Sequence, residues 1–307
     1  MSHDAVVAAV SPSPWVRFKQ FLLVRLVRAL VCVIVPTALV ITFLNLVVKR
    51  ALPDPALRVA WPELLIAATV LVAYWAYVRY VERRAVSELG WRHAGQELGA
   101  GWLVGTSLFA ACIGVLAVSG VYHLIAYNDW HSMIRPLAEA LMAACLEEVV
   151  MRAIVFRIIE ASLGSWFALV ISAILFGLMH LPNSNATLGA AAAIMIEAGV
   201  MLAAAYMLTR RLWLCIGIHA AWNFTQGGIF SIAVSGTASQ GLLSGSLQGP
   251  GWLTGGQFGV ESSLLAVLVC SAMGVYLLVR AQHAGKIARP FWQTRALSVS
   301  AQRVPIK

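Results

Sequence analysis

The sequence predicts an all-α protein that crosses a membrane about eight times. Of its 307 residues, 60% are hydrophobic and only 11% are charged, whereas soluble domains carry about 25% charged residues. So few charged side chains could not cover a water-facing surface. The composition therefore excludes a soluble globular protein, a disordered or collagen-like chain and a disulfide-rich scaffold.

Apolar runs of about 20 residues, the length that crosses a bilayer as a helix, recur along the chain. The eight predicted spans are 29–48, 61–78, 100–122, 137–158, 163–181, 187–209, 212–233 and 262–280. The first is longer than the apolar region of a signal peptide, which has about 7–15 residues, and no small-residue cleavage site follows it. Tryptophans near the span ends are typical of the aromatic belts of membrane proteins.

The distribution of Lys and Arg predicts that both termini are cytoplasmic. In that orientation 17 of the 22 Lys and Arg residues lie inside, four lie outside, and Arg152 lies within a span; cytoplasmic loops are enriched in these residues. The net charge of +9 is therefore interpreted as a topology signal, and no nucleic-acid partner is expected. The Ala- and Arg-rich composition favours a bacterial plasma membrane.

The chain is predicted to have three parts. Residues 1–132 form an N-terminal arm and three spans, 133–228 form a core, and 229–307 hold an external loop, the last span and a basic tail. Within the third part, 234–261 is Gly/Ser-rich and predicts a flexible loop, and 281–307 lacks Asp and Glu and suits the anionic cytoplasmic leaflet.

Small residues and cysteines within the spans are interpreted as packing residues. The motif Gly101-x-x-x-Gly105 is typical of close helix packing, here within one chain. The five cysteines fall in apolar stretches without a pairing pattern, so they predict neither disulfides nor a metal site; they are Cys32, Cys112, Cys145, Cys215 and Cys270.

Ionisable side chains gather in the spans between residues 135 and 226. A charged group at the centre of a bilayer costs about 2.5–3.5 kcal/mol on insertion scales and marks a functional site by default. Glu148 and Arg152, at i and i+4, can pair on one helix face. Glu147 points about 100° away from Glu148, so its carboxylate is free to act as a general base.

Two further spans add polar pairs with i, i+4 spacing, Phe176 with His180 and His219 with Asn223. Neutral imidazole and amide groups can donate hydrogen bonds to a developing oxyanion. A zinc site is less favoured, because the HExxH motif is absent.

The remaining polar residues have several interpretations. Glu197 lines a groove, approaches Arg152, or is a protonated carboxyl bonded to a neighbouring helix. Arg135 and Glu139 are predicted to form an interfacial ion pair, and His123 and His131 are predicted to be solvated.

The three motifs Glu147-Glu148-x-x-x-Arg152, Phe176-x-x-x-His180 and His219-x-x-x-Asn223 together resemble the CPBP family of CAAX-processing and bacteriocin-processing intramembrane glutamic endopeptidases, over residues 133–228. The sequence departs from that family at Met151 and Ala153, where an aromatic residue and glycine are usual.

The resemblance implies that peptide bonds are hydrolysed inside the membrane without a metal or other cofactor. It implies that Glu147 and His180 hold and deprotonate water, that Glu148 and Arg152 orient the site, and that His219 and Asn223 stabilise the oxyanion. Phe176 and Met151 are expected to contact the substrate.

The expected partners are membrane lipid and a substrate that is a membrane protein or a lipidated peptide. Two alternatives remain open at this point, a catalytically silent membrane scaffold or immunity protein and a zinc-dependent membrane protease.

Overall fold

The computed structural model describes residues 21–48, 51, 58, 60–290 and 293. Within them the fold is a bundle of helices with one small sheet, so the predicted all-α membrane bundle is confirmed. The N-terminal arm before residue 21, Lys49, Arg50 and most of the basic tail lie outside the described residues.

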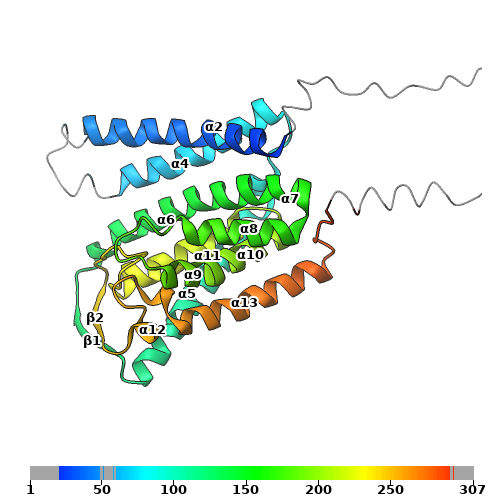
Figure 1. Ribbon diagram of the computed structural model, residues 1–307. Coiled ribbons are helices and arrows are strands. Elements are labelled where there is room, and N and C mark those ends of the chain that lie inside the picture. Colours follow the sequence, from blue (N-terminus) through cyan, green and yellow to red (C-terminus); the bar gives the residue numbers. More distant parts are fainter. Residues whose placement is uncertain (1–20, 49–50, 52–57, 59, 291–292, 294–307) are drawn as a thin grey trace, which may run out of the picture.

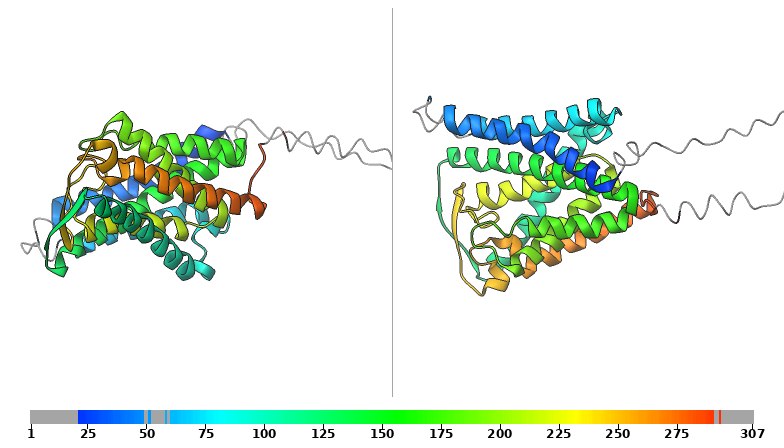
Figure 2. Two further views of the ribbon diagram at one scale, coloured as in Figure 1. Left: turned by 90° about the horizontal axis from the view of Figure 1, so that it is seen from below. Right: turned by 45° about the horizontal axis from the view of Figure 1, so that its top comes forward.

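In the first half of the bundle, α2, α4 and α6 run roughly along one direction, and α5 crosses them obliquely (Figures 1 and 2). The helices of this half are α2 Leu22–Phe43, continued by a π-helical turn to Val48; α4 Trp61–Ala76, continued to Glu82; α5 Ala94–Val118; α6 Ile134–Glu148, continued by a π-helix Val149–Phe156; and α7 Arg157–Leu163.

The second half contains several short helices and one long helix, α13. They are α8 Ser165–Leu178; α9 Leu188–Ile194, a π-helix Met195–Val200 and α10 Met201–Thr209; α11 Trp213–Asn223 with a π-helix Phe224–Ile229; α12 Gly251–Thr254; and α13 Leu264–His283. Each of the eight predicted ranges thus overlaps a helix.

Five helices in the described part of the chain are long and apolar enough to cross a membrane. They are Leu22–Val47, Trp61–Glu82, Ser87–Val118, Leu188–Thr209 and Leu264–His283. The eight predicted spans are therefore not all confirmed as spans. Within the predicted core, Leu188–Thr209 is one of the five, whereas α8 is a shorter apolar helix.

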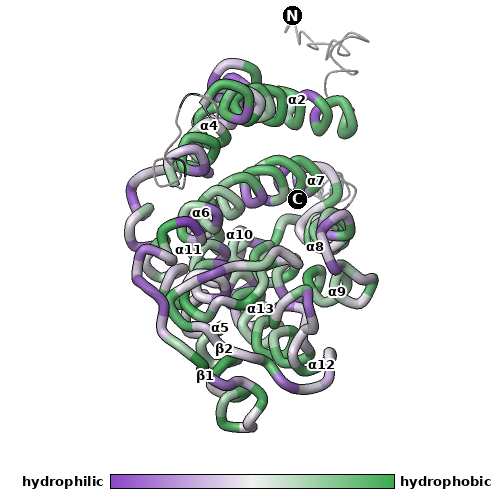
Figure 3. The backbone as a smooth tube through the Cα atoms, turned by 90° about the vertical axis from the view of Figure 1, so that its left-hand side faces the viewer, coloured by the Kyte–Doolittle hydropathy of each residue, from purple (hydrophilic) through white to green (hydrophobic). Residues whose placement is uncertain are grey.

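Helices α2 and α4 form an outer layer that packs on α6 and α7, while α5 and α13 lie on the other side of α11 and α10 (Figures 1 and 2). Large apolar side chains on the outer helices are exposed, as expected for surfaces in contact with lipid; Leu39 is 65% exposed and Leu103 is 69% exposed. Figure 3 shows α2 as hydrophobic over most of its length. The first helix begins at Leu22 rather than near residue 29, because the long side chains of Arg25 and Arg28 can follow the helix surface to its polar end.

The Gly/Ser-rich segment is folded, contrary to the predicted flexible loop. Strand β2 (Leu243–Leu247) pairs antiparallel with β1 (Tyr122–Tyr127), with Tyr122 opposite Leu247. Upstream of β2, the Gly236 N–H donates to the Phe258 carbonyl at 2.7 Å. Small side chains allow this close approach of backbones, since a Cβ at Gly236 would lie 1.7 Å from the Ser184 carbonyl oxygen.

The bundle centre is held by glycine contacts between α5 and α11. A Cβ at Gly105 would lie 2.3 Å from the Ile218 carbonyl oxygen, and one at Gly101 would lie 2.6 Å from that of Leu214. The predicted role of Gly101-x-x-x-Gly105 in internal packing is confirmed. This pairing positions His219 on α11.

We expect Gly105→Val to lower stability by about 1–3 kcal/mol, the usual cost of overpacking, because the new side chain would force α5 away from α11. The measurement is the thermal midpoint of the purified protein in detergent. The matched control is Gly114→Val on the same helix, where a Cβ would meet no atom within 4 Å. Equal midpoints for the two variants would show that the close approach does not matter.

The remaining structural predictions for polar and sulfur-bearing residues agree with the structure. Arg135 Nε donates to Glu139 Oε1 at 2.7 Å, so the interfacial pair is confirmed. His131 is exposed and bonds Asp129. All five cysteines are free; Cys32 is half-buried and the other four are buried.

Candidate active site

Helix α6 carries the two adjacent acids at its end, just before the π-helix. Arg152 Nη1 donates to Glu148 Oε1 at 3.1 Å, and Arg152 Nε lies 3.1 Å from Glu148 Oε2. Both side chains are at most 1% exposed. An ion pair this deep is stable only if its remaining polar groups are also satisfied.

The guanidinium of Arg152 links three helices. Its Nη2 donates to the Ala198 carbonyl at 3.1 Å, on the π-helix that follows α9. Its central carbon lies 4.4 Å from the centre of the Phe176 ring on α8, within the range of a cation–π contact. Phe176 is therefore a support for Arg152, and it also lines the smaller of the two cavities described below.

His180 lies in the turn that ends α8. Its Nδ1 is 2.7 Å from the Phe176 carbonyl oxygen. A carbonyl can only accept, so Nδ1 carries the hydrogen, and Nε2 of the neutral ring has a free lone pair. This Nε2 lies 3.8 Å from Glu147 Oε2.

His219 is oriented in the same way from α11. Its Nδ1 lies 2.9 Å from Glu148 Oε1, and the carboxylate oxygen accepts the hydrogen. Its Nε2 lies 3.9 Å from Glu147 Oε2. Two imidazole Nε2 atoms thus face one carboxylate oxygen, which has no hydrogen-bond partner among the described protein atoms.

The distances from Glu147 Oε2 to the two imidazole Nε2 atoms fit a bridging water molecule. Distances of 3.8 and 3.9 Å are too long for a direct hydrogen bond, but one water molecule can bridge polar groups at such a spacing. The side chain of Glu147 is 18% exposed, in contrast to the fully buried Glu148. The two neighbouring acids therefore differ. Glu148 is paired with Arg152, whereas Glu147 is partly exposed and lines a cavity.

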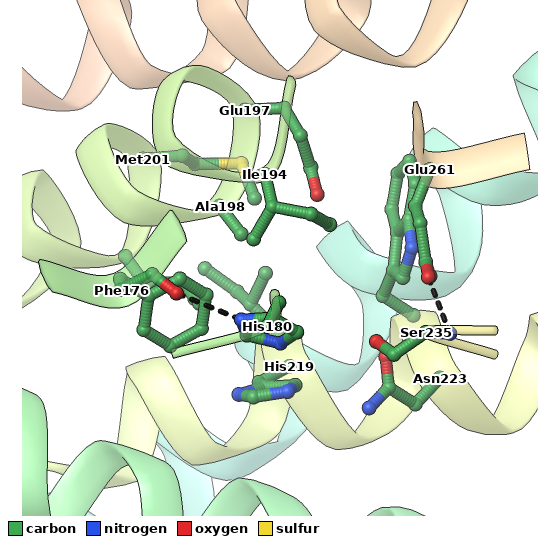
Figure 4. Close-up of a pocket in the computed structure, with 13 residues that line it drawn as sticks. Phe176, His180, Ile194, Glu197, Ala198, Met201, His219, Asn223, Ser235 and Glu261 are labelled. Atoms are coloured by element: carbon green, nitrogen blue, oxygen red, sulfur yellow. Dashed lines mark hydrogen bonds between the residues drawn. The ribbon is translucent and has the colours of Figure 1, made fainter. Parts of the chain in front are cut away.

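Two cavities meet at this cluster. The smaller, of about 30 Å³, is lined by His180, Glu197, His219 and Glu261, among others. The larger, of about 280 Å³, is lined by Glu147 and by residues of α4, α6 and the loop 234–239. Asn223 and Ser235 line both. Figure 4 shows His180 beside His219, with Asn223 and Ser235 next to them.

The structure brings the predicted residues together with one exception. Glu147, Glu148, Arg152, Phe176, His180 and His219 are joined by the contacts above, and Asn223 lies at the junction of the cavities. Met151, expected to contact substrate, is buried and lines neither cavity. It lies in the π-helix Val149–Phe156 that follows α6.

Glu197 lies on the smaller cavity and is buried. Of the three interpretations, the structure agrees with the one in which Glu197 lines a groove. The guanidinium of Arg152 donates to the carbonyls of Ala198 and Gly199, which follow Glu197.

Sequence reasoning missed Glu261, which lies in the short 3₁₀ turn Val260–Ser262 before α13. Its position is that of an ordinary acid at a helix N-terminus, so no sequence signal distinguishes it. In the structure it is 2% exposed, lines the smaller cavity with His219 and Glu197, and accepts the backbone N–H of Ser235. It thereby fixes the loop that covers the site.

We expect Glu261 to make stability depend on pH. Burial raises its pKa to about 7 from 4.5, against the opposing effect of the Ser235 N–H. Between those values the folded protein holds the proton more tightly than the unfolded chain, so the free energy of unfolding falls as pH rises through this window. The loss is on the order of 3 kcal/mol by pH 8.

The test is Glu261→Gln, which keeps the acceptor for Ser235 and removes the titration. Thermal midpoints measured from pH 5 to 8 are expected to fall less steeply in the variant than in the wild type. Glu139→Gln, at a partly exposed carboxyl, is the matched control. Parallel curves for wild type and Glu261→Gln would contradict the assignment.

No group of three or more His, Cys, Asp or Glu side chains arranged to hold a metal ion is present among the described residues. The closest approach to one is the set of Glu147, His180 and His219. Its separations are those given above.

Comparisons with known proteins agree with this geometry. Residues 129–225 match the family model described as type II CAAX prenyl endopeptidase Rce1-like. No curated protein and no solved structure matches the chain. The matched segment contains all three motifs, and it supports a CAAX-type membrane protease in general. Residues 129–225 are thus similar to the Rce1-like type II CAAX prenyl endopeptidases, and the predicted resemblance to the CPBP family is confirmed.

Proposed function

We propose that the protein is an intramembrane endopeptidase that hydrolyses a peptide bond with water activated by Glu147. The observation that carries the proposal is the position of Glu147 Oε2, 3.8 and 3.9 Å from the Nε2 atoms of His180 and His219. A water molecule held between these atoms would be next to a carboxylate base. Glu147 also lines the larger cavity, so its side chain connects that cavity with the two imidazole rings.

The reaction follows from this arrangement. Glu147 takes a proton from the water, whose oxygen attacks the carbonyl carbon of the scissile bond. Asn223, and His219 in its protonated form, donate to the oxyanion. The proton held by Glu147 then passes to the amide nitrogen as the C–N bond breaks, which yields an amine and a carboxylic acid; the acid then gives up its proton to the amine or to water.

Glu148 and Arg152 act as positioning residues. Because Nδ1 of His219 is held by Glu148 and Nδ1 of His180 by the Phe176 carbonyl, both rings present Nε2 to the cavity. A second acid that is ion-paired cannot compete with Glu147 for the water. The substrate is proposed to be a membrane-anchored protein or a lipidated peptide, reached from the surrounding lipid.

The experiment is comparative proteomics of membrane-protein termini in cells that carry wild-type protein or Glu147→Ala. New C-termini that appear only with the wild type would support proteolysis. Rescue of a deletion phenotype by Glu147→Gln would instead support the alternative of a silent scaffold.

One observation favours a second candidate, a zinc-dependent protease. Histidines that bind metals usually donate their other ring N–H to a carbonyl or carboxylate, as both rings do here. We expect 1,10-phenanthroline to leave activity of the purified protein unchanged, because Glu147 supplies the base. Loss of activity that added zinc restores would favour the zinc enzyme.

A further inference from the structure

The larger cavity opens at one end of the bundle. It is lined by Glu63 in the first turn of α4, by Pro136 and Glu139 in the first two turns of α6, and by the loop 234–239. The β1–β2 sheet lies at this same end, while α2 begins and α13 ends at the opposite one (Figure 1). Cavities at that opposite end, beside Trp91 and beside Gly164, share no lining residue with the site.

The two ends differ in their basic residues. Within the described residues, twelve Lys and Arg side chains belong to the end where α2 begins, and Arg58 and Arg135 belong to the end with the cavity. The twelve are Arg25, Arg28, Arg79, Arg83, Arg84, Arg92, Arg157, Arg210, Arg211, Arg280, Lys286 and Arg289. Several pair with acids, as Arg211 does with Glu97, but acids contribute little to topology. The end rich in Lys and Arg is the cytoplasmic one.

We infer that the site opens on the outer, extracytoplasmic side of the membrane, and that its substrates are exported or outward-facing polypeptide segments rather than prenylated tails held in the cytoplasmic leaflet. The part of the inference that concerns substrates rests on the proposed function. The sidedness rests only on the position of the cavity and the distribution of Lys and Arg. A chain reaching Glu147 would pass between α4 and α6 and under the loop 234–239, whose residues line the same cavity.

The lining of the cavity agrees with such a substrate. Its lining includes the acidic residues Glu63, Glu139 and Glu147 and the hydroxyl-bearing residues Ser235, Thr237 and Ser239. Glu139 is paired with Arg135, whereas Glu147 Oε2 has no hydrogen-bond partner among the described protein atoms. A prenyl chain has no polar atoms to offer Glu147 or the hydroxyl groups, and covering polar groups with hydrocarbon is costly. A peptide supplies N–H and carbonyl groups along its whole length.

The loop that forms the outer rim is held in place on both sides. Asn185 Nδ2, in the turn after α8, donates to the Gly236 carbonyl at 3.3 Å. Glu261 accepts the Ser235 N–H from the other side. The rim is therefore part of the folded site.

Sidedness is tested by cysteine labelling of the full-length protein in intact spheroplasts. Thr237→Cys, exposed on the rim, is expected to react with a membrane-impermeant maleimide. Gln282→Cys, exposed at the end of α13, is expected to react only after the membrane is permeabilised. Wild-type protein gives the background from its native cysteines. The reverse pattern would overturn the inference whether or not the protein is a protease.

Substrate class is tested by assigning each Glu147-dependent terminus to the cytoplasmic or the outer side of the membrane. Termini in exported or outward-facing segments are expected, and termini confined to cytoplasmic segments would overturn the inference while leaving the proposed function intact. If no Glu147-dependent terminus is found and labelling shows an outward-facing rim, the proposed function fails, and the substrate inference fails with it. The sidedness of the cavity would still hold.

Discussion

Replacing Glu147 with alanine is expected to abolish proteolysis while leaving the protein folded. A positioned general base contributes about 10²–10⁴-fold to a rate, so kcat/KM should fall at least about 100-fold. Stability should not fall, because Glu147 Oε2 has no hydrogen-bond partner among the described protein atoms. Both histidines keep the partners of their Nδ1 atoms.

The measurement pairs cleavage of a substrate identified by proteomics with the thermal midpoint in detergent. Asp129→Ala is the matched control, because Asp129 is an exposed acid that lines neither of the two cavities. An active Glu147→Ala protein would disprove the catalytic assignment. An inactive and unfolded one would show that Glu147 is structural.

Glu148→Ala should cost both stability and activity. Removing one partner of a buried ion pair typically costs about 3–5 kcal/mol, and here Arg152 would stay 1% exposed without its carboxylate. His219 would lose the acceptor of its Nδ1 hydrogen. We therefore expect a clearly lower thermal midpoint together with loss of cleavage.

A double-mutant cycle separates the two effects. Glu148→Ala with Arg152→Met removes the uncompensated charge, so the pair of changes should destabilise less than the two single changes added together. The partly exposed pair of Arg135 and Glu139 provides the comparison, since exposed pairs contribute about 0–1 kcal/mol. Strict additivity at Glu148 and Arg152 would contradict the ion pair as the source of the loss.

Much of the site could be predicted from sequence because helical periodicity is a local property. The i, i+4 spacing places Glu148 beside Arg152, and the cost of charge in a bilayer indicates that such groups face the interior. The glycine motif at Gly101 and Gly105 could be interpreted for the same reason, as small residues permit close contact.

What could not be predicted depends on departures from regular geometry and on contacts distant in sequence. Met151 lies in the π-helix Val149–Phe156, and its buried position away from both cavities does not match the contact with substrate that the family resemblance implies. Glu261 lies in a loop whose Gly/Ser content predicts flexibility. The bond of Glu261 to Ser235 follows from packing against α9 and α13, which no local pattern encodes.

The pairing of α5 with α11 also has a consequence for biosynthesis. The ribosome releases Gly101 and Gly105 long before their contacts Leu214 and Ile218, so these two helices meet only late in membrane insertion. Until then Glu148 lacks its hydrogen-bond partner, the His219 ring, which follows it by 71 positions in the sequence. A nascent or truncated polypeptide that ends before Trp213 therefore holds both acids and His180 but lacks His219 and Asn223, so the proposed site is complete only after α11 has been made.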